Sequence, residues 1–435
     1  MDKPALRISP REAALASLVG VYSRGKYSNI ETDAVIKRAG FSDQDRKLYA
    51  ALVFRTVEKT VTCDYIISLF SSRKIGDVEP AVLAALRLGV TQIMFMDGIS
   101  DHAACNETVE ALKKTPLRRA SGFVNAVLRS VVRSKDDIKY PGKGDPRRLP
   151  VRYSVSESIV AILERDYGEK AEDILRALEG APVTAVRVNT LKTNADRLSE
   201  ITGGAPVPGA PGALILPSGS VPALTPGFEE GLFFVQDVSS QLCVAALGAL
   251  PGMTVVDCCS APGGKAFGAA ADMKNDGRVI CFDIHENKLS LIRKGAERLG
   301  ISVIETRVCD GRTGDGLLDG TADRVICDVP CSGIGVISKK PEIRLKDLSS
   351  TGELSRTQLA ILTRASRYLK PSGRLVYSTC TLNKAENENV VREFLRENGG
   401  FALSDETTVL PDADRDGFYF AVIEKTERKE GTQQQ

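Results

Sequence analysis

The chain has 435 residues, of which 43% are hydrophobic and 26% are charged, and its formal net charge is +2. This length and apolar content allow two or three folded domains and exclude a disordered protein. The apolar stretches are too short and too interrupted to span a bilayer, and residues 1–4 lack the basic and apolar pattern of a signal peptide. We therefore expect a cytoplasmic protein that does not contact membranes.

Ten cysteines raise the question of disulfides or a metal site. Seven of them lie between Cys258 and Cys380, most at the ends of predicted buried strands and without paired CxxC spacing. This distribution favours reduced thiols that pack in the core of a protein from a reducing compartment. We expect no metal site.

Residues 11–133 show helical periodicity almost throughout. Apolar residues recur at steps of three and four, as at Leu83, Leu86, Val90 and Ile93. This pattern predicts an all-α domain over residues 1–139, followed by a linker over residues 140–150 that is rich in proline, glycine and charge. Basic residues outnumber acidic ones several-fold in residues 113–152, which indicates a nucleic-acid surface, although a solvated basic face gives the same pattern.

The remaining chain predicts a small α+β piece over residues 151–230, an α/β domain over residues 231–428 and a disordered tail over residues 429–435. Strands and helices alternate in the α/β domain, which predicts a parallel sheet with crossover helices, one of them over residues 353–369. The strands are predicted to end at Asp257, Asp283, Asp310, Asp328 and Ser378. Because ligands bind at the carboxyl ends of such strands, this row of acids indicates a site, although an aspartate can also cap a helix.

A glycine-rich turn follows the first of these strands. The sequence Pro262-Gly263-Gly264 carries no bulky side chain, so a ligand can approach its backbone. Asp283 ends the next apolar run and is suited to ribose hydroxyls, so the pair predicts a nucleoside cofactor. A dehydrogenase is disfavoured, because the turn is not G-x-G-x-x-G and the chain has just two histidines. S-adenosylmethionine (SAM) fits the turn better.

Two cysteines stand apart from those expected in the core. Cys331 and Cys380 each follow a strand, in residues 328–333 and 377–381, so both thiols should lie over the same sheet edge as the cofactor turn. Methylation of a pyrimidine at C5 needs such a thiol, because a thiolate must add to C6 before C5 becomes nucleophilic. An acid near N3 of cytosine stabilises the adduct, a role for Asp328 if it is protonated or shares a proton. The residues alone leave open which cysteine is the nucleophile.

A series of different short motifs is spread along nearly the whole chain. They are Arg87-Leu88-Gly89, His102-Ala103-Ala104 with Asn106-Glu107, residues 122–129, 187–192, 235–242, 259–265 and 328–333, Ser378-Thr379-Cys380 with Glu386-Asn387, and Asp416-Gly417-Phe418. Together they resemble the NOL1/NOP2/Sun family of RNA cytosine-5 methyltransferases, in its bacterial Sun/Fmu (RsmB) type. The resemblance implies an all-α NusB-like RNA-binding domain in front of a Rossmann-like, SAM-dependent methyltransferase domain.

The resemblance also implies a substrate and roles for particular residues. The product would be 5-methylcytosine in 16S rRNA, with cytosine 967 as the family's usual target. Cys380 would be the nucleophile and Cys331 the thiol that assists release. The cofactor-binding residues would be Cys259, Ser260, Ala261, Pro262, Gly263, Gly264 and Lys265 for SAM, Asp283 for the ribose, Asp310 beside the adenine, and Asp328 between cofactor and cytosine. The expected partner is 16S rRNA or a small-subunit assembly intermediate, bound by a monomer.

The chain departs from the family pattern in two places. Val329 stands where the family has a smaller residue or proline, and residues 155–158 lack the proline and tryptophan that follow the first Tyr-Ser. The second departure bears on RNA docking and not on catalysis. His102 has the simpler interpretation of a structural residue at a helix start.

Two other functions are compatible with parts of the sequence. A NusB-like RNA-binding or assembly factor could retain a methyltransferase fold without catalysis, but both thiols and the strand-end acids argue against it. A DNA cytosine-5 enzyme is disfavoured by residues 378–380 and by the helical first domain.

Overall fold

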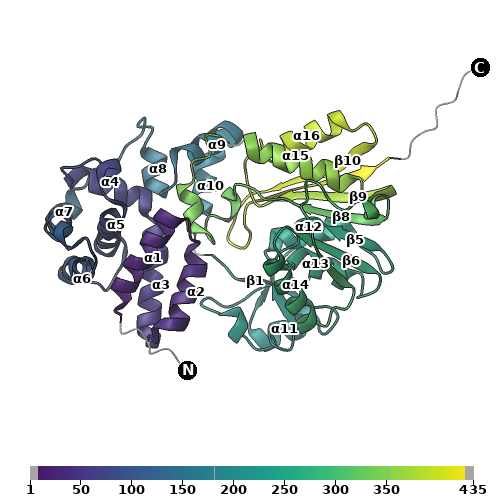
Figure 1. The fold of residues 1–435 in the computed structure, drawn as a ribbon, viewed down its shortest axis with the longest axis horizontal. Coiled ribbons are helices and arrows are strands. Elements are labelled where there is room, and N and C mark those ends of the chain that lie inside the picture. Colours follow the sequence, from purple (N-terminus) through teal and green to yellow (C-terminus); the bar gives the residue numbers. More distant parts are fainter. Residues whose placement is uncertain (1–7, 181, 351, 427–435) are drawn as a thin grey trace, which may run out of the picture. The chain divides into compact units, whose positions relative to one another are not determined.

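The computed structural model describes residues 8–180, 182–350 and 352–426, and it divides into two compact units (Figure 1). The first, called the helical unit, contains the chain up to Leu175 together with Ile337–Leu348. The second, called the sheet unit, contains Arg176–Val336 and the chain from Ser349 onwards. The piece expected over residues 151–230 is thus divided between the two. Within the described ranges, no helix is both long and apolar enough to cross a bilayer.

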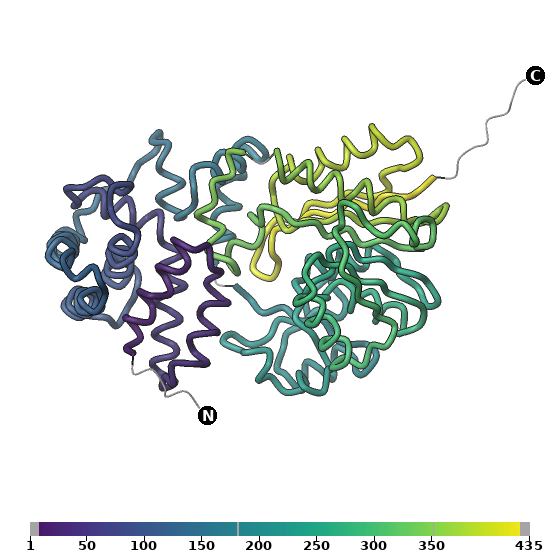
Figure 2. The backbone as a smooth tube through the Cα atoms, viewed as in Figure 1, coloured from purple at the N-terminus to yellow at the C-terminus, as the bar shows by residue number. Residues whose placement is uncertain are grey.

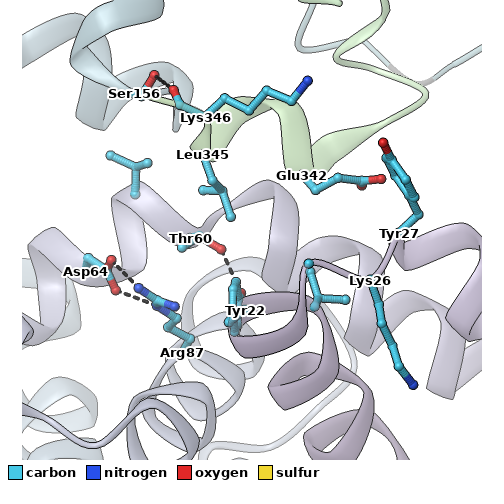
Figure 3. A pocket seen from close by; sticks show the side chains of 13 residues that line it. Tyr22, Lys26, Tyr27, Thr60, Asp64, Arg87, Ser156, Glu342, Leu345 and Lys346 are labelled. Carbon is cyan, nitrogen blue, oxygen red and sulfur yellow. Dashed lines mark hydrogen bonds and ion pairs between the residues drawn. The ribbon is translucent and has the colours of Figure 1, made fainter. Parts of the chain in front are cut away.

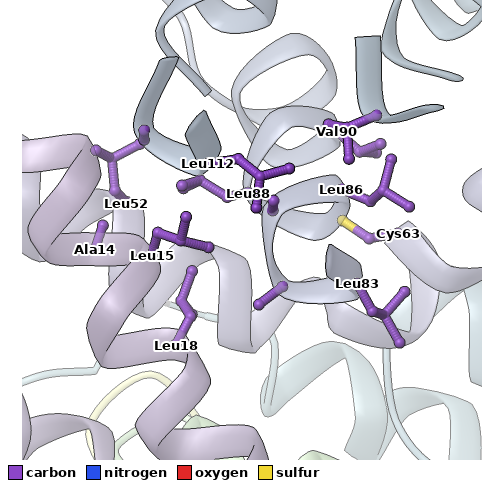
Figure 4. Close-up of a cluster of buried hydrophobic side chains, with 14 of the residues drawn as sticks. Ala14, Leu15, Leu18, Leu52, Cys63, Leu83, Leu86, Leu88, Val90 and Leu112 are labelled. Atoms are coloured by element: carbon purple, nitrogen blue, oxygen red, sulfur yellow. The ribbon is translucent and has the colours of Figure 1, made fainter. Parts of the chain in front are cut away.

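The first helices of the helical unit pack around one apolar core. They are α1 (Pro10–Arg24), α2 (Ser28–Ala39), α3 (Asp43–Glu58), α4 (Thr60–Phe70), α5 (Pro80–Phe95), α6 (Asp101–Lys113) and α7 (Ser121–Ser134). The helices α8 (Arg148–Tyr153) and α9 (Glu157–Tyr167) follow, and α10 (Ala171–Ala177) leads out of the unit. A serine side chain accepts a first-turn backbone N–H at four helix starts, at Ser9, Ser42, Ser100 and Ser156. The core includes Leu15, Leu18, Leu52, Leu86 and Leu112 (Figure 4). The prediction of an all-α first domain is confirmed.

The sheet unit is built on a seven-stranded sheet of order β10-β11-β9-β8-β5-β6-β7. Its strands are β5 (Thr254–Asp257), β6 (Arg278–Asp283), β7 (Ile304–Val308), β8 (Ala322–Asp328), β9 (Leu369–Thr379), β10 (Phe401–Val409) and β11 (Phe418–Lys425). The neighbours from β9 to β7 are parallel, whereas β11 is antiparallel to both β9 and β10.

Helices cover both faces of this sheet (Figure 1). One face carries α12 (Val238–Leu247), α13 (Gly264–Asp272) and α14 (Glu286–Leu299), and the other carries α15 (Gly352–Ser366) and α16 (Glu388–Glu397). Side chains alternate along each strand, so Val255 enters one core and Val256 the other. The predicted α/β, Rossmann-like class is confirmed.

A smaller antiparallel sheet of order β2-β3-β1-β4 precedes the large one. It consists of β1 (Ala185–Val188), β2 (Ala205–Pro206), β3 (Ala213–Ile215) and β4 (Phe233–Val235), with α11 (Ala195–Thr202) beside it. Val186, Leu214 and Phe233 are buried in its core together with Leu198 of α11.

Three predicted strand ends coincide with the observed ones, at Asp257, Asp283 and Asp328. The other two do not, because β7 stops two residues before Asp310 and β9 runs one residue past Ser378. The helix predicted over residues 353–369 ends at Ser366, since β9 already begins at Leu369 and continues through a register irregularity.

Candidate active site

The two cysteines singled out from the sequence lie side by side. Asp328 and Ser378 are paired neighbours at the ends of the parallel strands β8 and β9, so the segments that follow both strands emerge at the same sheet edge. The Sγ atoms of Cys331 and Cys380 are 3.1 Å apart, and both residues are half-buried cysteines that form no disulfide. The hydrogen bond with Cys380, together with burial, raises the pKa of Cys331 well above that of an ordinary thiol.

A buried carboxylate ties these two segments together. Glu386 has no exposed surface. Its side chain accepts hydrogen bonds from the Ser332 backbone N–H (2.8 Å), Gln358 Nε2 (3.0 Å) and Asn383 Nδ2 (2.9 Å). Gln358 Nε2 also donates to the Pro330 carbonyl at 2.9 Å. Because three donors converge on one buried acid, the loops that carry the thiols are held in one arrangement.

Two glycines allow the backbone to cross closely beside the thiols. Gly335 donates its N–H to the Cys380 carbonyl at 3.0 Å and accepts one from the Gly417 N–H at 3.0 Å. A Cβ atom at Gly335 would lie 1.8 Å from the Gly417 carbonyl oxygen. The crossing therefore requires a residue without a side chain at position 335.

Replacing Gly335 with alanine is expected to destabilise the sheet unit by about 3 kcal/mol, because the added methyl group meets rigid backbone and forces the two segments apart. Gly316→Ala is the matched control, since nothing lies within 4 Å of a Cβ added there. The measurement is thermal unfolding of both variants and the parent protein. Equal melting temperatures for Gly335→Ala and Gly316→Ala would contradict the close crossing.

An ion pair lies beside the thiols. Lys265 Nζ is 2.7 Å from Asp328 Oδ2, and Ser378 Oγ donates to Asp328 Oδ1 at 2.7 Å. Burial alone would lower the pKa of Lys265, but the neighbouring Asp328 carboxylate more than offsets this and raises it. Lys265 also lies over the Phe418 ring, 5.1 Å from its centroid. Lys265, the last residue of the predicted SAM motif, thus positions Asp328.

The neighbouring acid Asp257 has a different electrostatic state. It is 1% exposed, and its Oδ2 atom is buried without a hydrogen-bond partner. Burial, followed by the proximity of Asp328, raises the pKa of Asp257 to about 7. Asp257 therefore changes its charge near neutral pH.

The glycine-rich turn has the backbone that its sequence predicts. Gly263 has a φ of +110°, in the left-handed region that favours glycine, and it directly precedes α13. A Cβ atom at Gly263 would lie 2.5 Å from the Phe267 ring. The Ser260 N–H donates to the Phe282 carbonyl at 2.8 Å, which joins the turn to the strand that ends in Asp283.

The two predicted cofactor-binding acids Asp283 and Asp310 differ in how far their carboxylates are already occupied by other side chains. Asp283 Oδ1 accepts from the His285 N–H at 2.9 Å and lies 3.7 Å from Lys288 Nζ. Asp310 follows the edge strand β7, and its carboxylate accepts from Arg312 at 2.6 to 3.1 Å. The hydrogen bonds from Arg312 lower the pKa of Asp310. The structure thus brings Asp283 to the turn, while Asp310 is already bound by a neighbouring cation.

The residues around the turn fit SAM. Gln236 is buried, and both polar atoms of its side chain lack partners, as does Asp257 Oδ2. Gln236 Nε2 lies 3.8 Å from where a Cβ of Gly264 would be. Buried polar groups are normally hydrogen-bonded, so these atoms call for a polar ligand at the turn. A nucleoside with an amino-acid tail supplies matching donors and acceptors.

Some residues of this arrangement were not assigned a role from the sequence. They are Gln236, Gln358, Asn383 and Glu386. Glu386 belongs to a motif noticed there, but nothing local to it indicates a buried acid that binds three segments. His102 is the second residue of α6 and belongs to the helical unit, whereas the thiols belong to the sheet unit, and its Nε2 lies 2.9 Å from Asn106 Nδ2.

The fold and the sheet edge define a SAM-dependent methyltransferase. Among solved structures, the crystal structure of PH0851 has a TM-score of 0.83 at 24% identity and covers 97% of this chain and 100% of that chain. A methyltransferase homologue from Pyrococcus horikoshii has a TM-score of 0.57 at 28% identity and covers 65% and 100%.

Sequence comparison narrows this class to one family. Residues 244–424 match 16S rRNA methyltransferase RsmB/F, and residues 8–133 match the NusB family. The probable ribosomal RNA small subunit methyltransferase B of Bacillus subtilis is 36% identical over 91% of this chain and 90% of its own. The probable ribosomal RNA small subunit methyltransferase B of Synechocystis is 30% identical over 96% of this chain and 100% of its own. The chain therefore belongs to the family of ribosomal RNA small subunit methyltransferase B, whose members are SAM-dependent methyltransferases.

Proposed function

We propose that this protein forms 5-methylcytosine in 16S rRNA through a covalent adduct between Cys380 and C6 of the base. The target would be cytosine 967, the usual target implied by the family resemblance. The observation that carries the proposal is the pair of thiols, 3.1 Å apart at the sheet edge beside Asp328. A methyltransferase acting on a nitrogen or a hydroxyl group has no need of a nucleophilic thiol.

The chemistry follows from what the chain's residues can do. The Cys380 thiolate forms a bond to C6, and the electron pair of the C5–C6 double bond makes C5 nucleophilic. Bound SAM supplies an electrophilic methyl group, which C5 takes. A base then removes the C5 proton, and the released electron pair restores the double bond and expels the Cys380 thiolate. The enzyme is thereby regenerated.

Cys331 is assigned to the release of the product. Its raised pKa keeps it a thiol, and at 3.1 Å it can donate its proton in a hydrogen bond to the departing Cys380 sulfur. This supports Cys380 as the nucleophile, the assignment that the family resemblance implies. The Cys331 loop and the Cys380 loop are both hydrogen-bonded to Glu386, which supports the close approach of the two sulfurs.

Asp328 is assigned to the cytosine and to the cofactor. It holds Lys265 at 2.7 Å and Ser378 at 2.7 Å, and Asp257, with its pKa of about 7, is the proton-bearing acid near it. Residues 259–265 would wrap SAM, Asp283 would bind its ribose and Asp310 would lie beside its adenine. Asp310 must exchange its Arg312 contacts or share them with the ligand.

RNA is assigned to the helical unit. The match of residues 8–133 to the NusB family and the basic character of residues 113–152 support this assignment. We propose residues 1–139 as the RNA-binding domain, residues 151–230 as an intermediate piece and residues 231–428 as the catalytic domain of a monomer. The substrate would be 16S rRNA or a small-subunit assembly intermediate.

The Cys331→Ala variant is expected to accumulate covalent protein–RNA adduct, because it adds to C6 and transfers methyl but releases slowly. The measurement combines unmodified 16S rRNA with SAM, followed by a denaturing gel and nucleoside analysis of the RNA. The parent protein should yield 5-methylcytidine at one position and little adduct. A methylated nucleoside other than 5-methylcytidine, or adduct in Cys380→Ala but not in Cys331→Ala, would contradict the proposal.

A further inference from the structure

The segment Ile337–Leu348, called the strap, belongs to the helical unit although the chain on both sides of it belongs to the sheet unit. It follows directly on the loop that carries Cys331. The described residues between β8 and α15 contain just two 3-10 turns, Ile334–Val336 and Pro341–Leu345. Loops of this length without helix or strand are uncommon in compact domains and are commonly functional.

The backbone of the strap is held by two serines at the start of α9. Ser156 donates its N–H to the Arg344 carbonyl at 2.7 Å and its hydroxyl to the Lys346 carbonyl at 2.7 Å. The Ser158 hydroxyl accepts the Leu348 N–H at 2.9 Å. Figure 3 shows the bond between Ser156 and Lys346. These serines lie in residues 155–158, the stretch that departs from the family pattern.

Side chains of the strap are also seated in the helical unit. Arg344 is 2% exposed, and its Nη1 donates to the Tyr153 carbonyl at 2.8 Å. Leu345 packs against the helical core, and Ser28 Oγ donates to Glu342 Oε2 at 2.8 Å. In Figure 2 the strap runs as a green segment beside the purple N-terminal helices. Hydrogen bonds and one buried arginine therefore fix its position.

One side of the strap is not closely packed. Its residues Glu342, Leu345 and Lys346 form a wall of a cavity of about 520 Å³, which Tyr22 and Arg87 line from the helices (Figure 3). Because packing does not hold the strap on that side, its hydrogen bonds to Ser156 and Ser158 matter more for its position.

The other end of the connection lies at the thiols. Gly335 is hydrogen-bonded to the Cys380 carbonyl at 3.0 Å, and Ile337, two residues on, is buried and is the first residue of the strap. Two residues of extended chain span at most about 7 Å. A displacement of the strap must therefore be absorbed by Val336 or passed to the loop that carries Cys331.

We propose that the helical unit positions Cys331 against Cys380 by holding the strap, with Ser158 and Arg344 as the positioning residues. The inference rests on the proposed roles of the two thiols in catalysis. The helical unit thereby contributes to product release in addition to binding RNA. When the hydrogen bonds between the helical unit and the strap are lost, product release, which needs Cys331, becomes slower. The rate at which Cys380 adds to the base stays unchanged.

The first test measures the thiol geometry without RNA. Diamide takes up two electrons and two protons as Cys331 and Cys380 form a disulfide, and peptide mapping under non-reducing conditions gives the rate. Ser158→Ala and Arg344→Met should form it about tenfold more slowly, since misplacement by roughly 1 Å can cost up to a hundredfold in rate. Ser158→Thr keeps the hydroxyl and should restore the parent rate.

Ser17→Ala is the matched control, because Ser17 is a buried serine of the helical unit that bonds Tyr49 Oη at 2.8 Å and not the strap. It should oxidise at the parent rate. Two outcomes would overturn the inference. A tenfold slower disulfide formation in Ser17→Ala as well would indicate general destabilisation of the helical unit. Disulfide formation at the parent rate in both strap variants would indicate that the Cys331 loop is positioned independently of the strap.

The second test follows the adduct with 16S rRNA and SAM. The strap variants should form adduct at the parent rate and resolve it about tenfold more slowly. This is the factor by which disulfide formation is expected to slow in the first test. Equal slowing of formation and resolution would overturn the inference. If the parent protein forms neither adduct nor 5-methylcytidine while the strap variants still oxidise slowly, the proposed function fails and the positioning of Cys331 by the strap stands.

Discussion

The Cys380→Ala variant is expected to lose methyl transfer to 16S rRNA by about a thousandfold or more, because without the nucleophile C5 of cytosine does not become reactive. Cofactor binding should survive, since Cys380 lies past β9 whereas the glycine-rich turn follows β5. The measurement pairs a methyl-transfer assay with calorimetric titration of SAM. Loss of methyl transfer together with loss of SAM binding would mean that the substitution unfolds the sheet edge.

Cys105→Ala is the control for the loss of a thiol as such. Cys105 is 5% exposed in the helical unit and touches none of the candidate site. It should retain the parent rate of methyl transfer. Retention of activity in Cys380→Ala would contradict the assignment of the nucleophile, and loss of activity in Cys331→Ala without adduct would then point to Cys331.

The stability of the sheet unit is expected to fall by roughly 3 kcal/mol between pH 5 and pH 8 on account of Asp257 alone. Its pKa is raised to about 7 by burial and by Asp328, against 3.8 for an ordinary aspartate carboxyl. Between these values the unfolded chain is ionised while the folded protein holds its proton, so stability is lost as pH rises towards 7. Above the folded pKa the loss is complete.

The Asp257→Asn variant removes this titration and keeps a side chain of the same size. The difference in unfolding free energy between parent and variant, from calorimetry at each pH, cancels the other titrating groups. It should shift in favour of the variant by roughly 3 kcal/mol from pH 5 to pH 8. A difference that stays constant over this range would show that Asp257 does not change its charge there.

The framework of the sheet was predictable because its central strands are buried on both faces. A buried parallel strand is a continuous apolar run that ends abruptly, which is why the ends of β5, β6 and β8 were predicted correctly. The edges were not. Strand β7 is partly exposed and ends two residues before Asp310, and β10 is largely exposed and lacks the apolar alternation that predicts a strand.

The meeting of the two thiols was also predictable, because the loops after neighbouring parallel strands emerge at one edge of the sheet. Their separation of 3.1 Å was not. It depends on Glu386, whose donors come from three segments, and on the crossing of Gly335 with Gly417. The burial of Asp257, which raises the pKa of its carboxyl to about 7, could likewise not be predicted from the sequence.

The sequence by itself determined the two kinds of domain and the glycine-rich turn, and it placed the two thiols after neighbouring strands, because local periodicity and short motifs carry that information. Only the tertiary structure decided where the strap belongs and how the thiols are oriented. The hydrogen bond from Ser156 to Lys346 joins residues 190 positions apart, and the hydrogen bond between the two thiols joins residues 49 positions apart. Such contacts arise when distant segments fold together, and no local pattern in the chain encodes them.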